Sequence, residues 1–432
     1  MRAVTLDEPP DVHVRRLAAS FLEFCMFVSR ARSALVTGTA LVLAAALTAC
    51  DAGSAFTGSA GDDPSPAASE AAAAAQSGRV HANVRTGATD VPVDQVLAVR
   101  AEGSRLTSVS VAPTSGDGAG EVAGALSADE TSWTATGLLE PGTSYVLRAR
   151  ASAADGATVR RVARFSTREL SLEEQTYASV APLAGETVGV GMPVVVSFDV
   201  PVTDRASIEQ HLHVTSSPVQ RGSWRWISDT EVHWRPKRYW RAGTDVTVDV
   251  DINSVPAGGG VYGQESRRIE FHVGDANVYK VDAKSHQMQV FSNGKLLRKL
   301  PITTGKAGFT TRSGTKVIME KSEKRRMNSE TVGIAAGSSE AYDINDVRWA
   351  MRLTHSGEFI HAAPWSVGSQ GRENVSHGCT GLSTADAGWL YAMSKRGDVV
   401  EYVGTDRPMT LDNGYGDWNA SFADYRQGSA LS

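Results

Sequence analysis

Cysteine is scarce in this chain, since its 432 residues include only Cys25, Cys50 and Cys379. The sequence contains no CxxC pair and no Cys/His spacing of the kind that binds zinc, so it predicts neither a disulfide framework nor a metal site. We expect no metal and no cofactor. Each of the three cysteines therefore needs a separate explanation.

A strong charge of either sign is also missing, because the formal net charge is −5. This value gives no indication of a nucleic-acid partner. A compact basic run from Lys321 to Arg326 is short and mixed in sign, so we interpret it as a solvated face rather than a phosphate site. With 41% hydrophobic and 21% charged residues, the composition is that of a globular protein, and the length indicates roughly two to four domains.

The N-terminal apolar run is too short for a membrane helix. It extends from Ala34 to Leu47, follows Arg30 and Arg32, and has about the length of a signal-peptide core. It ends in Leu47-Thr48-Ala49-Cys50, which resembles the lipobox of bacterial lipoproteins. That resemblance implies cleavage before Cys50, a lipid anchor on its side chain and a protein outside the cytoplasm that faces the cell wall. Ordinary signal cleavage and an uncleaved anchor are the alternatives.

Residues 1–50 are therefore predicted to be a signal peptide with a lipobox, although their beginning is unusual. Acidic residues, among them Asp7 and Glu8, occupy the part of a signal that is normally basic. Met26 would start a shorter signal, which favours it as the true start and would remove Cys25. Residues 51–78 are rich in Ala, Ser, Gly, Asp and Pro and cannot bury enough apolar surface to order themselves, so they are predicted to be a flexible linker.

Two predicted β-modules follow, over residues 79–170 and 171–274. Each consists of short alternating runs separated by Gly, Pro, Asp and Ser, which is typical of a β-sandwich. The expected strands include 93–99, 106–111, 144–150, 158–165 and 194–198, with Trp224, Trp226, Val232 and Trp234 on single faces of two more.

A weak internal repeat relates the two modules. The segment from Leu139 to Leu147 aligns with the segment from Trp240 to Val248, and both contain a Gly-Thr turn that opens an alternating strand. The offset of about 100 residues is that of one immunoglobulin-like domain, and both modules resemble bacterial immunoglobulin-like domains. Inward tryptophans on such strands belong to the core more often than they stack on sugar rings, so we interpret the modules as spacers.

The third domain, residues 275–404, is also predicted to be rich in strands. Ser292-Asn293-Gly294-Lys295 is a hairpin signal, because Asn-Gly accepts the positive φ of a type I′ turn. Strands are expected at 278–281, 287–291 and 296–303, and a helix at 384–396 with Gly397 as its C-cap. We expect residues 405–432 to form a C-terminal tail that packs on this domain.

The chemistry of the third domain centres on Ser376-His377-Gly378-Cys379. A thiol is a poor nucleophile at neutral pH unless a neighbouring group favours the thiolate. His377 lies two residues before Cys379, and Gly378 allows both flexibility and a close approach of substrate to the backbone. N–H groups around Cys379 would form an oxyanion hole. His-Gly-Cys also recurs by chance, and the alternative is a buried apolar thiol beside a surface histidine.

A longer stretch, residues 359–383, strongly resembles the catalytic signature of the bacterial L,D-transpeptidases. In that family a histidine opens the signature and Ser-His-Gly-Cys follows, which match His361 and residues 376–379. The segment from Ala363 to Gly368 and the later segment from Lys395 to Glu401 resemble one subgroup, in which tandem immunoglobulin-like domains precede the catalytic domain. The likeness covers most of residues 80–425.

The resemblance implies a mainly β fold, in which two immunoglobulin-like β-sandwiches precede a β-rich YkuD-type catalytic domain with a short helix. It also implies a two-step acyl transfer. Cys379 attacks the diaminopimelate carbonyl of a tetrapeptide stem, D-Ala leaves, and a thioester forms. The side-chain amine of a neighbouring stem then attacks the thioester and gives a 3→3 crosslink in peptidoglycan. Carbapenem-type β-lactams would acylate the same cysteine.

The resemblance also assigns roles to the two histidines and their neighbours. His377 is the expected base, and His361 is expected to shape the site, with the base as its alternative role. The backbone carbonyl of Ala362, where the family often has Gly or Ser, would orient the catalytic imidazole. Gly381 stands where the family often has Asn or Arg, so a side chain that would touch the substrate is missing. The family turn Thr-Pro-x-Gly is Thr311-Arg312-Ser313-Gly314 here and lacks its proline.

Substrate contacts are expected from a further group of residues. Tyr342 would cover the donor pocket, Met327 would lie in a flap, and Ser356 and Gly357 would lie in the strand edge that leads to His361. The expected substrate-binding set is Met327, Tyr342, Ser356, Gly357, Trp365, Ser376, Thr380 and Gly381.

Two other functions stay open at this stage. An L,D-carboxypeptidase or cysteine peptidase would form the same thioester but use water as the acceptor. A wall-binding lipoprotein with an inactive third domain would form no thioester, although both His377 and Cys379 are present. The predicted partners are donor and acceptor peptide stems, carbapenem-type β-lactams and, through Cys50, the membrane.

Overall fold

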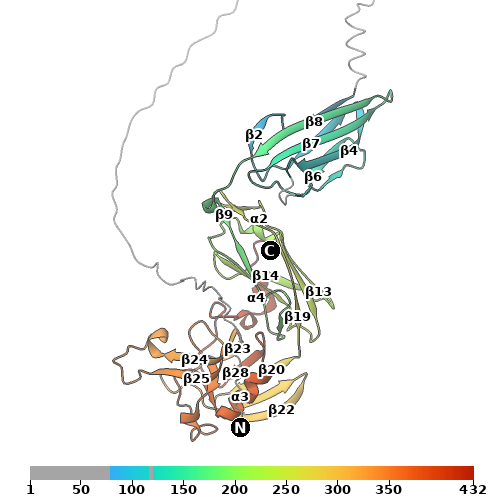
Figure 1. The fold of residues 1–432 in the computed structure, drawn as a ribbon. Helices are drawn as coiled ribbons and strands as arrows, with labels where there is room; N and C mark the ends of the chain where they lie inside the picture. The colour runs from blue at the N-terminus through green and yellow to red at the C-terminus, as the bar shows by residue number, and fades with distance from the viewer. Residues whose placement is uncertain (1–77, 116–119) are drawn as a thin grey trace, which may run out of the picture. The chain divides into compact units, whose positions relative to one another are not determined.

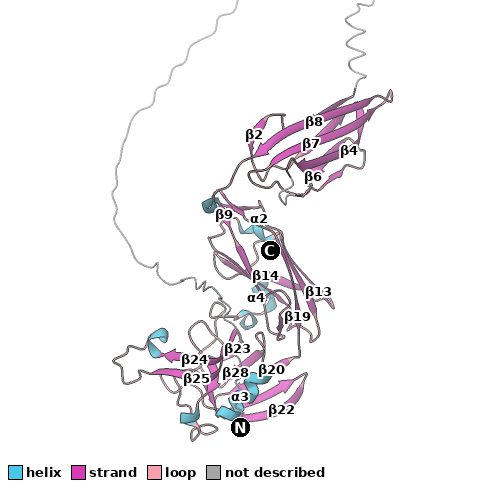
Figure 2. Cartoon of the chain, viewed as in Figure 1, coloured by secondary structure: helices cyan, strands magenta, loops and turns pink. Residues whose placement is uncertain are grey.

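The computed structural model describes residues 78–115 and 120–432. The predicted signal peptide and Cys50 lie outside these residues, as does the predicted linker apart from Gly78. Strands dominate the described chain and its helices are short, as Figure 2 shows in magenta and cyan, so the predicted mainly β fold class is confirmed. Within the described residues, none of the helices is both long enough and apolar enough to span a membrane.

Residues 79–167 form a β-sandwich of two four-stranded sheets (Figure 1). Trp133 from one sheet and Leu147 and Phe165 from the other belong to one buried cluster. The strand predicted at 93–99 begins only at Ala98, because Gln95 N–H closes a turn onto the Pro92 carbonyl. One sheet has the order β1 (Arg79–Ala82), β3 (Ala98–Glu102), β6 (Ser132–Ala135), β5 (Gly124–Leu126). The other has the order β2 (Ala88–Val91), β8 (Thr158–Thr167), β7 (Ser144–Ala153), β4 (Ser104–Pro113).

Residues 175–273 form a second sandwich, in which two four-stranded sheets enclose a core rich in tryptophan. Trp224, Trp226, Trp234 and Trp240 are all buried, which confirms that they are core residues. One sheet has the order β10 (Ala178–Ala181), β12 (Val194–Phe198), β15 (Glu231–Pro236), β14 (Gly222–Trp226). The other has the order β11 (Thr187–Val188), β19 (Arg267–Val273), β16 (Asp245–Val250), β13 (Leu212–Ser217). Smaller elements are η1 (Leu172–Glu174), α2 (Arg205–Glu209) and the sheet β17 (Pro256–Gly258), β18 (Val261–Gly263), β9 (Gln175–Thr176).

The third domain consists of two sheets with a buried cluster between them that also contains Leu390 of the helix α3. One sheet has the order β22 (Lys295–Pro301), β21 (Gln287–Ser292), β20 (Asn277–Asp282), β28 (Val399–Val403), β23 (Gly314–Val317). The other has the order β24 (Glu320–Asn328), β25 (Asp343–Arg352), β26 (Phe359–Ala362), β27 (Thr380–Leu382). The remaining elements are η2 (Ser329–Val332), η3 (Pro364–Ser366), α3 (Thr384–Met393), η4 (Asp417–Asn419) and α4 (Phe422–Arg426).

In this domain the predicted hairpin turn is present, whereas the predicted helix is shorter than expected. Asn293 and Gly294 join β21 to β22 with φ values of 49° and 79°, as the predicted type I′ turn requires. The helix ends at Met393, and Ser394 leaves the helical conformation with ψ of 149°. Lys321 Nζ donates to the Ser394 carbonyl, so a distant side chain satisfies this end of the helix in place of a glycine cap.

The C-terminal tail contacts two domains, whereas the sequence led us to expect only one of them. Asn419 Nδ2 donates to the Thr315 carbonyl of the third domain at 2.7 Å. Trp418 Nε1 donates to the Gly191 carbonyl of the second sandwich at 2.8 Å. The tail therefore connects the second sandwich to the third domain through contacts on both.

Candidate active site

Two short parallel strands position the residues of the candidate site. The strand β26 carries His361 and pairs with β27, so that His361 lies opposite Gly381. Every residue of β26 is buried, because an apolar strand in the middle of this sheet is covered on both faces. Cys379 directly precedes β27 and therefore lies at the same end of the strand pair as the start of β26.

The sulfur of Cys379 is held by the backbone that precedes β26. Its Sγ–H donates to the Gly357 carbonyl at 3.6 Å, and the residue is half-buried. Burial raises the pKa of the Cys379 thiol to about 12, although the Phe359 N–H partly opposes this rise by donating to the sulfur. The thiol is therefore neutral at physiological pH in the unliganded protein, and a base must remove its proton when it reacts.

The loop in front of Cys379 is braced by side-chain hydroxyls. Ser376 Oγ donates to the Cys379 carbonyl at 2.6 Å and accepts the Gly378 N–H at 3.1 Å. Gly378 has φ of 118°, a conformation that L side chains rarely adopt. Thr311 Oγ1 donates to the Gly378 carbonyl at 2.8 Å. The predicted roles of Gly378 and Ser376 near the nucleophile are thus consistent with a tightly turned loop.

His361 is buried and has a defined orientation. Its Nδ1 donates to the Ala362 carbonyl at 2.8 Å, so the neutral ring carries its proton on Nδ1 and presents an unprotonated Nε2. Burial lowers the pKa of His361, against the smaller opposing effect of the Ala362 carbonyl. The imidazole is therefore neutral near pH 7 and able to accept a proton. The carbonyl that we expected to orient the catalytic imidazole is bound to His361.

His377 is tethered to a carboxylate that the sequence analysis did not identify. Its Nε2 lies 2.7 Å from Glu340 Oε2, which also accepts from Lys306 Nζ at 2.6 Å. Donation from Lys306, followed by that from His377, lowers the pKa of Glu340. The His377 ring also packs against Phe309, with ring centroids 4.6 Å apart. Because the carboxylate accepts a hydrogen bond from Nε2, the neutral ring carries its proton on this nitrogen, and Nδ1 is its unprotonated nitrogen.

A cavity of about 260 Å³ brings most of the predicted site residues together. Trp365 is 58% exposed and lies at this cavity with its ring 6.0 Å from that of His361. The predicted residues that line it are Met327, Tyr342, His361, Trp365, Ser376, His377, Cys379 and Gly381. The described residues 78–115 and 120–432 contain no cluster of three His, Cys, Asp or Glu side chains that could hold a metal ion.

Comparisons with known proteins agree with this geometry. A family model described as L,D-transpeptidase catalytic domain matches residues 276–401, and one described as bacterial Ig domain matches residues 88–256. The chain is 35% identical to L,D-transpeptidase 2 of Mycobacterium tuberculosis over 353 residues, which is 82% of this chain and 85% of that protein. It is 36% identical to L,D-transpeptidase 5 of the same species over 318 residues, which is 72% of this chain and 68% of that protein.

This chain belongs to the L,D-transpeptidase family. It is an acyltransferase that acts outside the cytoplasm on the cell wall, and its first two domains are immunoglobulin-like. Among solved structures, the LD transpeptidase LdtMt1 in complex with imipenem is 38% identical, with 52% of this chain and 98% of that chain covered and a TM-score of 0.47.

Three predicted contacts of this L,D-transpeptidase lie elsewhere than the main cavity. Thr380 is buried, and its hydroxyl bonds Tyr402 Oη at 2.7 Å on the side away from the cavity. Ser356 is exposed in the turn before β26 rather than in a strand, and its N–H donates to Asn413 Oδ1 at 2.9 Å. Gly357 lies in the same turn with φ of 92° and borders a second cavity.

The second cavity, of about 280 Å³, also reaches Cys379. It shares Met327, Tyr342 and Cys379 with the first cavity, but its other walls include Arg325, Arg326 and Arg352, which pair with acidic residues beside the cavity. Cys379 therefore borders two cavities of different character, the first mainly apolar and the second more polar.

Two acidic residues near the site were missed in the sequence. Glu340 lies 37 residues from His377 in a segment with no recognisable motif, so no signal pointed to it. Glu358 is different, because it stands directly before the apolar strand Phe359–Ala362. A carboxylate at the start of a buried strand needs a partner, and that need was a usable signal.

Proposed function

We propose that this L,D-transpeptidase uses Cys379 as its nucleophile on peptidoglycan stem peptides. The sulfur attacks the diaminopimelate carbonyl of a tetrapeptide stem, a C–S bond forms, and the C–N bond to D-Ala breaks. The side-chain amine of a second stem then attacks the thioester, the C–S bond breaks, and a 3→3 crosslink results. The thiol proton leaves with the D-Ala amine, and the acceptor amine supplies the proton that regenerates the thiol.

The observation that carries this proposal is the position of Cys379 between two cavities. A transfer enzyme must bring a donor and an acceptor to one sulfur, and both cavities border Cys379. A hydrolase needs only one peptide site and access for water. Met327 and Tyr342 line both cavities, which supports the expectation that both residues contact substrate. The double access supports transfer over the L,D-carboxypeptidase alternative.

We further propose that His361 is the base, which exchanges the roles expected from the sequence. A base needs an unprotonated nitrogen near the thiol, and the Ala362 carbonyl leaves Nε2 of His361 in that state. The His377 ring is held at Nε2 by Glu340 and packs against Phe309 and Tyr342, so we assign it a positioning role at the cavity. The Gly378 N–H is bound to Ser376 Oγ, so the other backbone N–H groups around Cys379 remain the proposed oxyanion hole.

The test is a mass analysis of the protein incubated with tetrapeptide stem, and separately with a carbapenem. We expect an acyl-enzyme mass, crosslinked dimer and free D-Ala from the native protein, and an adduct with the carbapenem. Cys379→Ala should give none of these while keeping the native unfolding temperature. An adduct that persists in Cys379→Ala would exclude this nucleophile, and tripeptide without dimer would identify a hydrolase.

Lipid anchoring through Cys50 is a separate proposal. It is supported by the lipobox-like Leu47-Thr48-Ala49-Cys50 and by the extracytoplasmic site of action of the family. Cys50→Ala should move the protein from the membrane fraction of the native host to the soluble or wall fraction. Retention in the membrane would mean that the segment from Ala34 is an uncleaved anchor.

A further inference from the structure

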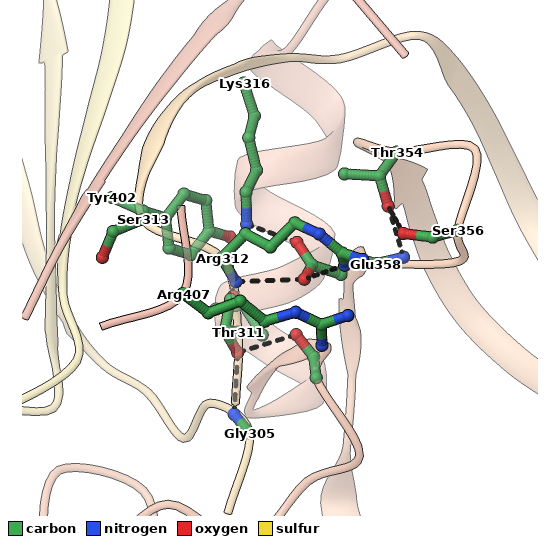
Figure 3. A network of polar contacts seen from close by, with 12 residues as sticks. Gly305, Thr311, Arg312, Ser313, Lys316, Thr354, Ser356, Glu358, Tyr402 and Arg407 are labelled. Carbon is green, nitrogen blue, oxygen red and sulfur yellow. Dashed lines mark hydrogen bonds and ion pairs between the residues drawn. The ribbon is translucent and has the colours of Figure 1, made fainter. Parts of the chain in front are cut away.

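A buried group of charges lies directly behind the nucleophile, and the chemistry above assigns it no role. Lys316 Nζ contacts Glu358 Oε2 at 2.5 Å, and Arg312 donates to Glu358 Oε1 from both its backbone N–H and its guanidinium, each at 3.0 Å. Figure 3 shows both cationic side chains directed at the one carboxylate. The Lys316 side chain is fully buried and that of Glu358 is 6% exposed. We call Arg312, Lys316 and Glu358 the support cluster.

The support cluster fixes the backbone segment whose carbonyl and N–H groups contact the Cys379 sulfur. Glu358 lies between Gly357, whose carbonyl accepts from Cys379 Sγ, and Phe359, whose N–H donates to it. The Glu358 N–H is fixed in turn by Thr354 Oγ1 at 2.9 Å. Anchoring the Glu358 carboxylate therefore fixes the two neighbouring backbone groups that contact the thiol.

The same segment that supplies the two cations also supports the other side of the nucleophile. Thr311, the neighbour of Arg312, donates to the Gly378 carbonyl at 2.8 Å. It also accepts the Gly305 N–H at 2.8 Å (Figure 3). Lys316 lies over the Tyr402 ring, 3.7 Å from its centroid, and Tyr402 bonds Thr380, the residue after Cys379. Residues on both sides of Cys379 are thus tied to this one segment.

The charges of the support cluster do not balance. Two cations face one carboxylate, so the resting cluster has one unmatched positive charge beside a neutral thiol. Formation of the thiolate would supply the second anion. In a buried site such charge interactions are weakly screened. The charge of Lys316 lowers the pKa of Cys379, whereas the charge of Glu358 raises it by more. Lys316 therefore stabilises the thiolate against its own carboxylate partner.

We propose that Lys316, Arg312 and Glu358 are positioning residues of this L,D-transpeptidase, which fix the backbone around Cys379, and that Lys316 stabilises the Cys379 thiolate against the charge of Glu358. The proposal rests on the assignment of Cys379 as the nucleophile. The other titratable groups that face or adjoin the sulfur are His361 on β26, His377 on the cysteine loop with Glu340 behind it, Tyr342 ahead of β25 and Tyr402 on β28.

The pH dependence of thiol reactivity distinguishes charge support from ordinary structural support. Burial lowers the pKa of Lys316 to about 8, against the opposing effect of Glu358. Below pH 8 the native cluster has a net charge of +1, and above it Lys316 loses its proton and the net charge becomes zero. A Lys316→Met cluster has zero net charge at every pH. The benefit of Lys316 should therefore exist below pH 8 and vanish above it.

The experiment measures alkylation of Cys379 by iodoacetamide in the full chain between pH 6 and 10. The rate is followed on the Cys379 peptide by mass spectrometry, so other cysteines do not interfere. Lys316→Met should react about tenfold more slowly than the native protein at pH 7, the effect expected of one nearby charge. The two rates should converge above about pH 9. A ratio that stays constant from pH 6 to 10 overturns the proposal, because lost packing has no such pH dependence.

A double variant covers the case in which Lys316→Met leaves Glu358 poorly paired and does not fold. Lys316→Met/Glu358→Gln removes both members of the pair and leaves Arg312 as a permanent +1 charge. It should react at least as fast as the native protein at pH 7, because it loses the larger, unfavourable effect of Glu358 together with Lys316, and it should exceed the native rate above pH 8, where native Lys316 is neutral. A double variant slower than the native protein throughout would overturn the proposal.

A matched control separates charge at the site from loss of an ion pair elsewhere. Glu186→Gln breaks the partly buried Arg396–Glu186 pair between the second sandwich and the third domain. It should lower the unfolding temperature and leave the pH profile of Cys379 alkylation native, and a shifted profile would overturn the argument from local charge. Because alkylation reports the thiol itself, this test is independent of turnover. If Cys379→Ala kept its carbapenem adduct, the proposed function would fail instead.

Discussion

His233 and Asp417 lie 184 residues apart in the sequence and form a buried ion pair, with Nδ1 of the histidine 3.0 Å from Oδ1 of the aspartate. His233 belongs to β15 of the second sandwich, and Asp417 belongs to the tail. Glu231 contacts the other ring nitrogen at 2.9 Å, and the Tyr425 hydroxyl donates to Asp417 at 2.8 Å. The tail is therefore attached to the sandwich by charge as well as by packing.

The stability of this attachment should depend on pH. Burial opposes the charged ring, but Asp417 and then Glu231 outweigh it and raise the pKa of His233 to about 9. Because the unfolded histidine titrates near 6.5, the stabilisation is complete below about pH 6.5 and is lost as the pH rises to about 9. The loss should be about 3 kcal/mol in the free energy of unfolding, measured by urea denaturation at pH 6.5 and pH 9.

The double variant His233→Gln/Asp417→Asn is the control for this measurement. It lacks both charges, so its free energy of unfolding should fall less between pH 6.5 and 9 than that of the native protein. Equal pH slopes for the two proteins would show that the ion pair does not titrate in this range.

The two histidines of the site should differ in their contributions to rate. His361→Ala should slow carbapenem acylation by ~10²–10⁴, the usual value of general-base catalysis. His377→Ala should cost only about tenfold, the worth of one hydrogen bond to a charged group. Stopped-flow acylation rates would measure both, with unfolding temperatures as the check on folding.

Glu340→Gln is the matched variant for His377→Ala, because it weakens the same His377–Glu340 hydrogen bond by changing the acceptor. Its loss of rate should be similar to that of His377→Ala. A larger loss for His377→Ala than for His361→Ala, at unchanged stability, would restore His377 as the base.

Gly381 should not tolerate a side chain. A Cβ at this position would lie 2.9 Å from the Ala363 Cβ, which is closer than real Cβ contacts come, and 3.0 Å from the Thr303 Cγ2, which is a very tight contact. Gly381→Ala should therefore destabilise the protein by about 1–3 kcal/mol and slow acylation, because the cavity beside Cys379 narrows. Gly381→Ala/Ala363→Gly should recover most of the stability, and failure to recover would show that space is not the cause.

The second sandwich should contribute more to the stability of the catalytic domain than the first sandwich does. Val399 of β28 belongs to the buried cluster of the second sandwich, and the tail binds that sandwich through Asp417. A chain of residues 171–432 should be acylated by a carbapenem at close to the full-length rate. A chain of residues 275–432 should lose at least about 3 kcal/mol of stability, because Asp417 loses its buried partner. Equal unfolding midpoints for the two shortened chains would contradict this.

Local features of the structure were predictable from the sequence, because they depend on a few neighbouring residues. The turn at Asn293 and Gly294 follows from their tolerance of positive φ, and the strand Val194–Phe198 follows from a run of β-branched residues. The nucleophile candidate follows from the Ser376 to Cys379 motif together with His361. These features depend on local backbone conformation or on a short sequence motif, and both can be read directly from the sequence.

The roles within the site were decided by the tertiary structure. Which nitrogen of each histidine carries the proton depends on partners that folding supplies, namely the Ala362 carbonyl for His361 and Glu340 for His377. Thr380 turns away from the cavity because Tyr402 of β28 offers its hydroxyl a partner. Lys316 meets Glu358 across 42 residues of sequence, and His233 meets Asp417 across 184. Hydrogen bonds and buried charges are set by which strands lie side by side, and no spacing along the chain specifies that.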